Sequence, residues 1–374
     1  MRQVAVVGVG MVRFDQYPQR SITDLGVEAV LAALADAGLG WPDVQAAWCG
    51  AAGQGMTVGT RVLAELGLTG APITTVDNAS ASGSTAFREA YLSVACALYD
   101  VALAVGVGKM TGGTVGAPLD RKEILQTQAM GFLPPAGVFA MRTRRRMHDY
   151  RTTIVPYARV SVKNHHHGAL NPFAQFQKEV TLEEVLQSRL ICDPLTVLHC
   201  CPVSDGAAAA VVASLPRARR MGARPLVRVA ASAFRSEACS SDGQLGPALT
   251  ELTARQAYEE AGAGPEDIHL VQVHDAFTVE EIDYYESLGF CSRGDGERLV
   301  EEGATAIGGR IPFNTDGGLL ARGHPIGPTG LAQVWETVLQ LRGRAGPRQV
   351  EGATTGLCQM IGAGGVCVIH ILKR

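Results

Sequence analysis

The strongest constraint on the fold is a weak repeat that relates the two halves of the chain. A helical pattern of apolar residues over 22–37 ends in the string AGLGWPDV, and a matching pattern that begins near Leu249 ends in AGAGPEDI. The offset between Asp43 and Asp267 is 267 minus 43, or 224, in a chain of 374 residues. Self-similarity on this scale predicts two duplicated α/β halves, each with helices packed on a sheet.

The first half opens with a strand and a capped helix. The apolar run VAVVGV over residues 4–9 predicts a strand that is buried on both faces. Ser21 and Gly38 then flank the helical pattern at the positions expected for its start and its stop.

The same register extends the repeat to later elements. A second helix is predicted from Ser82 to about Leu98, opposite one that begins after Pro328. A strand over residues 101–107 is expected to correspond to one over residues 365–371.

One segment does not fit the repeat. Residues 112–198 are polar and rich in arginine, and we expect a long loop insertion over the active site, because inserts of this length in compact domains are usually functional. The predicted organisation is a first half of residues 1–111 with about 199–220, the insertion, and a second half of residues 221–374.

Composition narrows the class of protein. Lys and Arg total 33 against 36 for Asp and Glu, a net charge of −3 that argues against binding nucleic acid by neutralising phosphates. Nine cysteines without CxxC pairs fit a reducing compartment. The apolar run at the N-terminus is too short for a signal peptide, and no stretch approaches 18 apolar residues. A soluble cytoplasmic protein is the prediction.

Two turns lead into the duplicated helices, namely DNASASGS over residues 77–84 and GHPIGPTG over residues 323–330. Unpaired backbone N–H groups at a helix N-terminus favour developing negative charge. Two such turns that face each other would form the floor of a catalytic site.

Four ordered sequence blocks carry a resemblance to a known family. The string NTDGGLLARGHPIGPTG over residues 314–330 resembles the GHP block of thiolases, and HDAF over residues 274–277 resembles the HDxF block of the sterol-carrier-protein and archaeal branches. The strings YARVSVKNH from Tyr157 and SDGAA from Ser204 also fit that branch. The chain therefore resembles the thiolase superfamily over essentially its whole length.

This resemblance implies a thiolase fold, a duplicated five-layer αβαβα core with a loop-domain insertion, in a homodimer or tetramer. It also implies acyl-CoA thioesters as substrates, with no permanently bound cofactor and no metal. In the family, a cysteine in a CxS turn accepts the acyl group, the GHP histidine activates it, and a second cysteine moves the proton on the α carbon.

The residue at the nucleophile position is Ser80, which departs from the family pattern. A serine hydroxyl has a far higher pKa than a thiol, so its base has to remove the proton during attack. Three interpretations stay open. Ser80 is a true nucleophile, or it marks a relative that needs no acyl-enzyme, or it is a deliberate Cys-to-Ser substitution that traps a ligand.

The second cysteine is also displaced. Ala276 stands where the HDCF block carries it, and Cys358 lies in a glycine-rich C-terminal string with a longer spacing than CxG. Cys358 is either the remaining thiol acid/base or a buried loop cysteine. If it is buried, proton transfer falls to the two histidines.

The resemblance gives the histidines their roles. His324 is expected to act as the base and His274 to help form an oxyanion hole, and imidazoles titrate near working pH. Arg142 and Arg145, in a basic run of the insertion, are candidates for binding the phosphates of CoA, with a solvated helix face as the alternative. Gly323 and Gly364 are expected where the backbone approaches the ligand closely.

The sequence thus predicts a thiolase-like acyltransferase that makes or breaks a carbon–carbon bond of a CoA thioester. One alternative is a thiolase-like retro-aldol lyase that acts on a β-hydroxyacyl-CoA together with a small zinc-ribbon/OB-fold partner. Another is a non-catalytic acyl-CoA-binding subunit.

Overall fold

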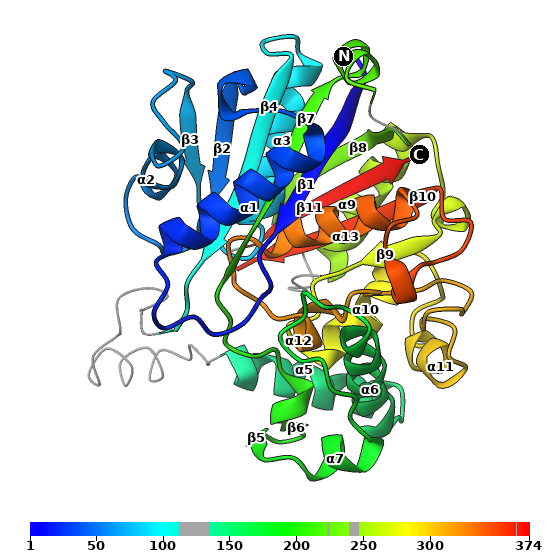
Figure 1. Ribbon diagram of the computed structural model, residues 1–374. Helices are drawn as coiled ribbons and strands as arrows, with labels where there is room; N and C mark the ends of the chain where they lie inside the picture. The colour runs from blue at the N-terminus through cyan, green and yellow to red at the C-terminus, as the bar shows by residue number, and fades with distance from the viewer. Residues whose placement is uncertain (112–134, 223–224, 239–246, 364) are drawn as a thin grey trace.

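A nine-stranded sheet organises the molecule in the computed structural model, which describes residues 1–111, 135–222, 225–238, 247–363 and 365–374 (Figure 1). Its strand order is β3-β2-β4-β7-β1-β8-β11-β10-β9. The strands are β1 (Val4–Met11), β2 (Ala46–Gly50), β3 (Ile73–Val76), β4 (Val101–Gly108), β7 (Gly206–Ser214), β8 (Val227–Ser236), β9 (Leu270–Gln272), β10 (Thr355–Gly362) and β11 (Val366–Lys373). A separate hairpin pairs β5 (Leu190–Cys192) with β6 (Leu195–Thr196).

Some helices cover the two faces of this sheet, and others pack mainly against one another beyond it. They are α1 (Ile22–Ala37), α2 (Val58–Ala64), α3 (Ser82–Ala95), α5 (Pro135–Asp149), α6 (Val155–Ala169), α7 (Leu182–Gln187), α8 (Leu215–Arg220), α9 (Pro247–Ala261), α10 (Thr278–Ser287), α11 (Gly296–Glu301), α12 (Gly318–Ala321) and α13 (Thr329–Leu341). Within the described residues, none of these helices combines the length and the apolar character that crossing a membrane requires.

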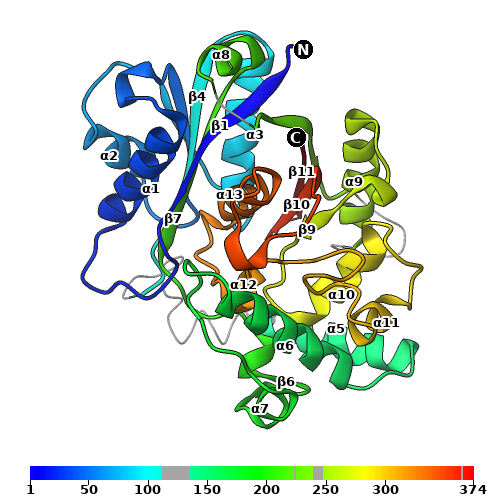
Figure 2. The same cartoon turned by 45° about the vertical axis from the view of Figure 1, so that its right-hand side comes forward.

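The five predicted layers are visible in Figure 2, which looks almost along α13. Helices α1 and α2 cover the outer face of the first half, α3 and α13 lie between the halves, and α9 covers β8 and β11. The two halves join within one continuous sheet, where β1 pairs with β8 at Ala5↔Arg228 and Val6↔Val227.

The duplication is confirmed by the ends of α1 and α9. Gly38 and Gly262 follow these helices with φ of 66° and 55°, in the left-handed region that glycine adopts without strain. A single-turn helix comes next in each half, at Trp41–Asp43 and Pro265–Asp267. In each turn the aspartate accepts a hydrogen bond from the backbone N–H three residues earlier, at 2.8 Å in the first half and 2.9 Å in the second.

One predicted correspondence between the two halves is wrong by one strand. β4 follows α3, runs parallel to β2 and is antiparallel to β7. In the same way, β10 follows α13, runs parallel to β9 and is antiparallel to β11. The counterpart of residues 101–107 is therefore β10, not residues 365–371. Both β10 and β11 are apolar and almost wholly buried, so hydrophobicity alone does not distinguish them.

The insertion is largely helical rather than a long loop. Beyond residues 112–134, which lie outside the described part of the chain, it contributes α5, α6, α7 and the β5–β6 hairpin. Helix α6 packs against α10, α11 and α12 of the second half (Figure 1). The segment after α6 also bonds to the end of α12, because the amides of Gln175 and Phe176 donate to the carbonyls of Arg322 and Ala321, each at 3.0 Å.

Candidate active site

Ser80 lies in a strained turn between β3 and α3. Ala79, just before it, has a φ of 48°, which is unfavourable for a residue with a side chain. Side chains hold the strained residue in place, since Asp77 accepts from the Ala79 amide at 3.0 Å and the Ser82 hydroxyl donates to its carbonyl at 2.6 Å. The turn therefore presents the half-buried Ser80 at the N-terminus of α3.

The N-termini of α3 and α13 meet through glycines. A Cβ on Gly83 would lie 2.6 Å from the carbonyl oxygen of Gly327, and one on Gly330 would lie 2.2 Å from the Ser84 hydroxyl. Both distances are far below van der Waals contact, so only glycine permits this approach. The two turns from separate halves face each other, as the sequence predicts.

His324 completes a pair with Ser80. The Ser80 Oγ and the His324 Nε2 lie 3.2 Å apart. The other ring nitrogen, Nδ1, lies 2.9 Å from the Thr329 hydroxyl, which itself donates to the Pro325 carbonyl at 2.6 Å. Since that hydroxyl has used its proton, it accepts from Nδ1–H, and Nε2 is left as the basic nitrogen toward Ser80.

The surroundings favour the neutral form of this imidazole. Burial lowers the pKa of His324 well below its ordinary range, and the charges of His274 and Arg322 lower it further. A neutral histidine that bonds a hydroxyl through Nε2 is equipped to take the hydroxyl proton.

His274 lies next to His324. The two ring centroids are 5.2 Å apart with the planes at 83°. His274 Nδ1 lies 3.1 Å from the Glu280 carboxylate, which also accepts from the Phe277 amide at 3.1 Å and the Tyr284 hydroxyl at 3.3 Å. Among the described residues, His274 Nε2 is buried without a hydrogen-bond partner, so it is free for a substrate oxygen.

Cys358 lies apart from this constellation. It is buried in the middle of β10 within an apolar cluster, and its thiol contacts the Thr337 hydroxyl at 3.1 Å. Burial raises the pKa of this thiol to about 12, which disfavours the thiolate. Of the two interpretations offered by the sequence, this environment favours the buried structural cysteine.

The two arginines of the basic run have different environments. Arg142 is partly buried and pairs with Asp283 at 2.6 Å, so its guanidinium is already engaged. Arg145 is exposed and pairs with Asp149 one turn away, at 2.5 Å. The roles of Arg142 and Arg145 in binding CoA phosphates both stay predictions.

The remaining two predicted site residues are Gly323 and Gly364. Gly323 has a φ of 108°, and a Cβ there would lie 2.8 Å from the Ser204 hydroxyl. That hydroxyl accepts from the His324 amide at 3.0 Å. Because Gly323 has no side chain, the Ser204 hydroxyl can come close enough to hold the backbone of His324. Gly364 lies outside the described residues.

Three supporting residues were missed by the sequence reasoning. Glu280, Thr329 and Ser204 each bond to one of the two histidines, through a side chain or the backbone. Glu280 accepts from the Phe277 amide at the start of α10, but Phe277 has no side-chain acceptor for the reciprocal bond, so the sequence carries no capping-box signal for Glu280. Thr329 lies inside the GHPIGPTG string but carries no signal that it faces the histidine.

Comparisons with known proteins identify the family of the chain. The thiolase N-terminal domain family matches residues 4–215, and the thiolase C-terminal domain-like family matches residues 231–374. The chain belongs to the thiolase family.

Curated relatives of this thiolase-family chain are similar over its full length. An acetyl-CoA acetyltransferase from Methanothermobacter thermautotrophicus is 40% identical, with all of both chains covered. Sterol carrier protein 2 from Bos taurus is also 40% identical, over 99% of this chain and 72% of its own. A benzoylsuccinyl-CoA thiolase subunit from Thauera aromatica is 37% identical, over 94% of this chain and 92% of its own.

Solved structures show the same fold. One described as an Ltp2-ChsH2(DUF35) aldolase has a TM-score of 0.88 and 30% identity, over 100% of this chain and 98% of its own. The human mitochondrial 3-ketoacyl-CoA thiolase in complex with CoA has a TM-score of 0.77 at 18% identity, over 100% of this chain and 98% of its own.

Proposed function

We propose that this protein is a thiolase-type acyltransferase that transfers the acyl group of a CoA thioester by way of Ser80. The observation that carries the proposal is the 3.2 Å contact between the Ser80 hydroxyl and the basic nitrogen of His324. The names of the relatives, an acetyl-CoA acetyltransferase and a benzoylsuccinyl-CoA thiolase subunit, support acyl-CoA as the substrate class.

The first half-reaction follows from the tautomer of His324. Ser80 Oγ attacks the thioester carbonyl while its proton passes to His324 Nε2, and the C=O bond becomes a tetrahedral oxyanion. Reformation of the carbonyl breaks the C–S bond, and the departing CoA thiolate takes the proton from His324. The products are an acyl-serine and free CoA, with the neutral base regenerated.

His274 would stabilise negative charge on substrate oxygen. An imidazole bonded to a carboxylate through Nδ1 holds a fixed orientation, and a second proton on Nε2 makes it a donor whose charge Glu280 compensates. In the carbon–carbon step, His324 would remove a proton from the α carbon of a second acyl-CoA. The resulting enolate attacks the acyl-serine carbonyl and forms the new carbon–carbon bond. As the carbonyl reforms, the C–O bond to Ser80 breaks and the serine oxygen takes the proton from His324.

Intact-protein mass spectrometry tests the acyl-serine directly. After incubation with acetyl-CoA and quenching in acid, the wild-type protein is expected to gain one acetyl group, and Ser80→Cys is expected to gain it faster because a thiol ionises more readily. Ser80→Ala serves as the control and is expected to gain nothing. Acylation of Ser80→Cys alone would contradict a serine nucleophile.

A retro-aldol lyase is the second candidate, and its support is the similarity to the solved structure described as an aldolase. In that reaction His324 would take the proton of a β-hydroxyl group. The Cα–Cβ bond would then break to give a carbonyl compound and a CoA enolate, and the enolate carbon would take the proton from His324. No acyl-enzyme forms, and a zinc-ribbon/OB-fold partner would be required. Release of a carbonyl product without any mass shift on Ser80 would select this candidate.

Glu280→Gln tests the support of His274. The change removes the charge that faces Nδ1, and we expect kcat to fall by about 10- to 100-fold with KM nearly unchanged, as for other residues that orient a catalytic imidazole. Steady-state kinetics with acyl-CoA give both constants. Tyr284→Phe is the matched control, because it removes the weaker 3.3 Å contact to the same carboxylate and keeps the charge. A loss confined to KM would contradict the role.

A further inference from the structure

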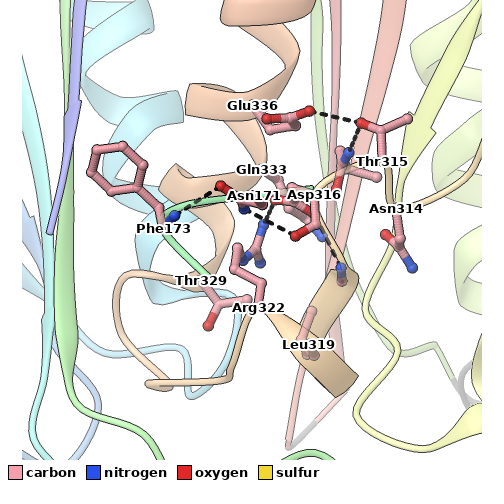
Figure 3. Close-up of polar contacts among 12 residues, drawn as sticks. Asn171, Phe173, Asn314, Thr315, Asp316, Leu319, Arg322, Thr329, Gln333 and Glu336 are labelled. Atoms are coloured by element: carbon pink, nitrogen blue, oxygen red, sulfur yellow. Dashed lines mark hydrogen bonds and ion pairs between the residues drawn. The ribbon is translucent and has the colours of Figure 1, made fainter. Parts of the chain in front are cut away.

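A short segment of the insertion, residues 171–176, bonds to the part of the chain that leads to His324. Figure 3 shows its first residue, Asn171, next to Asp316. The Asn171 side chain donates to the Asp316 carbonyl at 3.0 Å and accepts from the Phe173 amide at 3.0 Å. These bonds fix the start of the segment against the second half of the chain.

Near the end of this segment, Gln175 bonds to two other parts of the chain. Its backbone amide donates to the Arg322 carbonyl at 3.0 Å. Its side-chain oxygen accepts from the Ser204 hydroxyl at 2.5 Å, and its side-chain nitrogen donates to the Val203 carbonyl at 3.2 Å. The bond to Val203 fixes which end of the amide group faces Ser204, so the oxygen stays the acceptor.

The Ser204 hydroxyl connects Gln175 to the histidine. Because the hydroxyl donates its proton to Gln175, its lone pairs accept from the His324 amide, at 3.0 Å. Ser204 is fully buried, and the carboxylate of the next residue, Asp205, accepts from the Met110 amide at 2.7 Å. Ser204 is therefore held in place, and it holds the histidine backbone in turn.

Gly323 makes these contacts possible and also makes them necessary. It has a φ of 108°, and a Cβ there would lie 2.8 Å from the Ser204 hydroxyl and 3.0 Å from the Gln175 side-chain oxygen. Glycine has more conformational freedom than any other residue, so the peptide groups on its two sides need other contacts to stay in place. The bonds to the Arg322 carbonyl and the His324 amide hold those two peptide groups.

We propose that Gln175 is a positioning residue for the reaction. It holds the backbone on both sides of Gly323, and this keeps the His324 imidazole at the Ser80 hydroxyl. The insertion is thereby part of the machinery that places the base. This inference rests on the proposed role of His324, whose Nε2 lies 3.2 Å from the Ser80 Oγ. A displacement of about 1 Å at such a contact can slow a reaction about 10²-fold.

Gln175→Met tests the proposal, because methionine keeps the length of the side chain and loses both of its hydrogen bonds. We expect kcat for CoA release from acetyl-CoA to fall by about 10-fold with KM nearly unchanged. Gln177→Met is the matched control. The Gln177 side chain donates to the carbonyls of Pro172 and Ala174, at 2.9 and 3.2 Å, in the segment just before it. Its replacement is expected to leave kcat unchanged.

A double-mutant cycle shows whether Gln175 acts through Ser204. Ser204→Ala is expected to lower kcat by a similar factor. Gln175→Met/Ser204→Ala is expected to lower it no further than the larger single loss, because residues that act through one contact are not additive. A merely structural effect of each residue would multiply the two losses. If Gln175→Met does not fold, Gln175→Asn, which is one methylene too short for the contact, takes its place in the cycle.

Hydrogen exchange of the His324 amide gives a readout that needs no turnover. It is followed by NMR in protein with isotope-labelled histidine, and the signal is assigned from His324→Gln. The amide is expected to exchange about 5- to 10-fold faster in Gln175→Met and in Ser204→Ala than in the wild type, and at the wild-type rate in Gln177→Met.

Unchanged exchange in Gln175→Met would overturn the proposal, whatever reaction the protein catalyses. An unchanged kcat in that variant, an equal loss in Gln177→Met, or multiplied losses in the double variant would overturn it as well. Faster exchange in a protein that releases no CoA would contradict acyl transfer and leave the positioning of His324 by Gln175 standing.

Discussion

Replacing His324 with alanine is expected to lower kcat/KM for an acyl-CoA substrate by about 10³-fold, or roughly 4 kcal/mol of transition-state stabilisation. The variant removes the nitrogen that lies 3.2 Å from the Ser80 hydroxyl and leaves the turn that presents Ser80 in place. Coenzyme A release, followed with a thiol reagent, measures the first half-reaction. Turnover that is unchanged in His324→Ala would end the assignment of this residue as the base.

A second buried histidine supplies the control. His370 is fully buried, bonds to the Ser232 hydroxyl at 3.0 Å and lies edge-on to Phe87. His370→Gln is therefore expected to lower thermal stability while leaving kcat/KM within a few-fold of the wild type. A comparable loss of kcat/KM in both variants would mean that disrupted packing explains the His324 result.

The pH dependence follows from the direction of the His324 shift. Because the pKa of His324 is held well below its ordinary value, the neutral base is already present at neutral pH and stays present as the pH falls. We expect that protonation of His324 does not limit turnover until the pH is well below about 6.5, the ordinary pKa of histidine. Activity that falls between about pH 7.5 and 6.5, in step with protonation of His324 followed by NMR, would contradict this expectation.

The sequence predicted those parts of the fold that depend on residues close together in the chain. The cap residues Ser21 and Gly38 bound α1 as expected, because capping depends on hydrogen bonds within a few residues. The contact between His324 and the Ser80 turn was also predictable, since duplicated helices bring their N-termini together at glycines.

The features that the sequence did not predict depend on contacts between residues that are far apart in the chain. The counterpart of β4 was misplaced because loop lengths differ between the halves, and only strand pairing reveals the register. Arg142 and Arg146 look like a solvated basic run in sequence, but their acidic partners lie about 140 residues later, near Glu286. Glu280 was missed for a similar reason, since its bond to His274 depends on the angle between β9 and α10.

Arg146 joins the insertion to the second half of the chain, and Arg146→Met is expected to destabilise the protein by about 3–5 kcal/mol. Its guanidinium, only 7% exposed, bonds to Glu297 at 2.8 Å, Asp283 at 2.9 Å and Glu286. The substitution removes the arginine shared by three carboxylates, of which Asp283 also pairs with Arg142. Burial already raises the pKa of Asp283 against the lowering effect of both arginines. Breaking such a cluster from one side leaves buried charges uncompensated.

Denaturant unfolding measures this effect, with Arg145→Met as the matched control. Arg145 is one residue away, 78% exposed, and paired only with Asp149 on the same helix, so its loss is expected to cost no more than about 0.5 kcal/mol. The pair of variants also separates structure from ligand binding. If Arg145 bound the phosphates of CoA, Arg145→Met would raise KM for acyl-CoA without changing stability. Equal destabilisation by the two variants would show that Arg146 does not anchor α5, and that contacts elsewhere hold the insertion against α10 and α11.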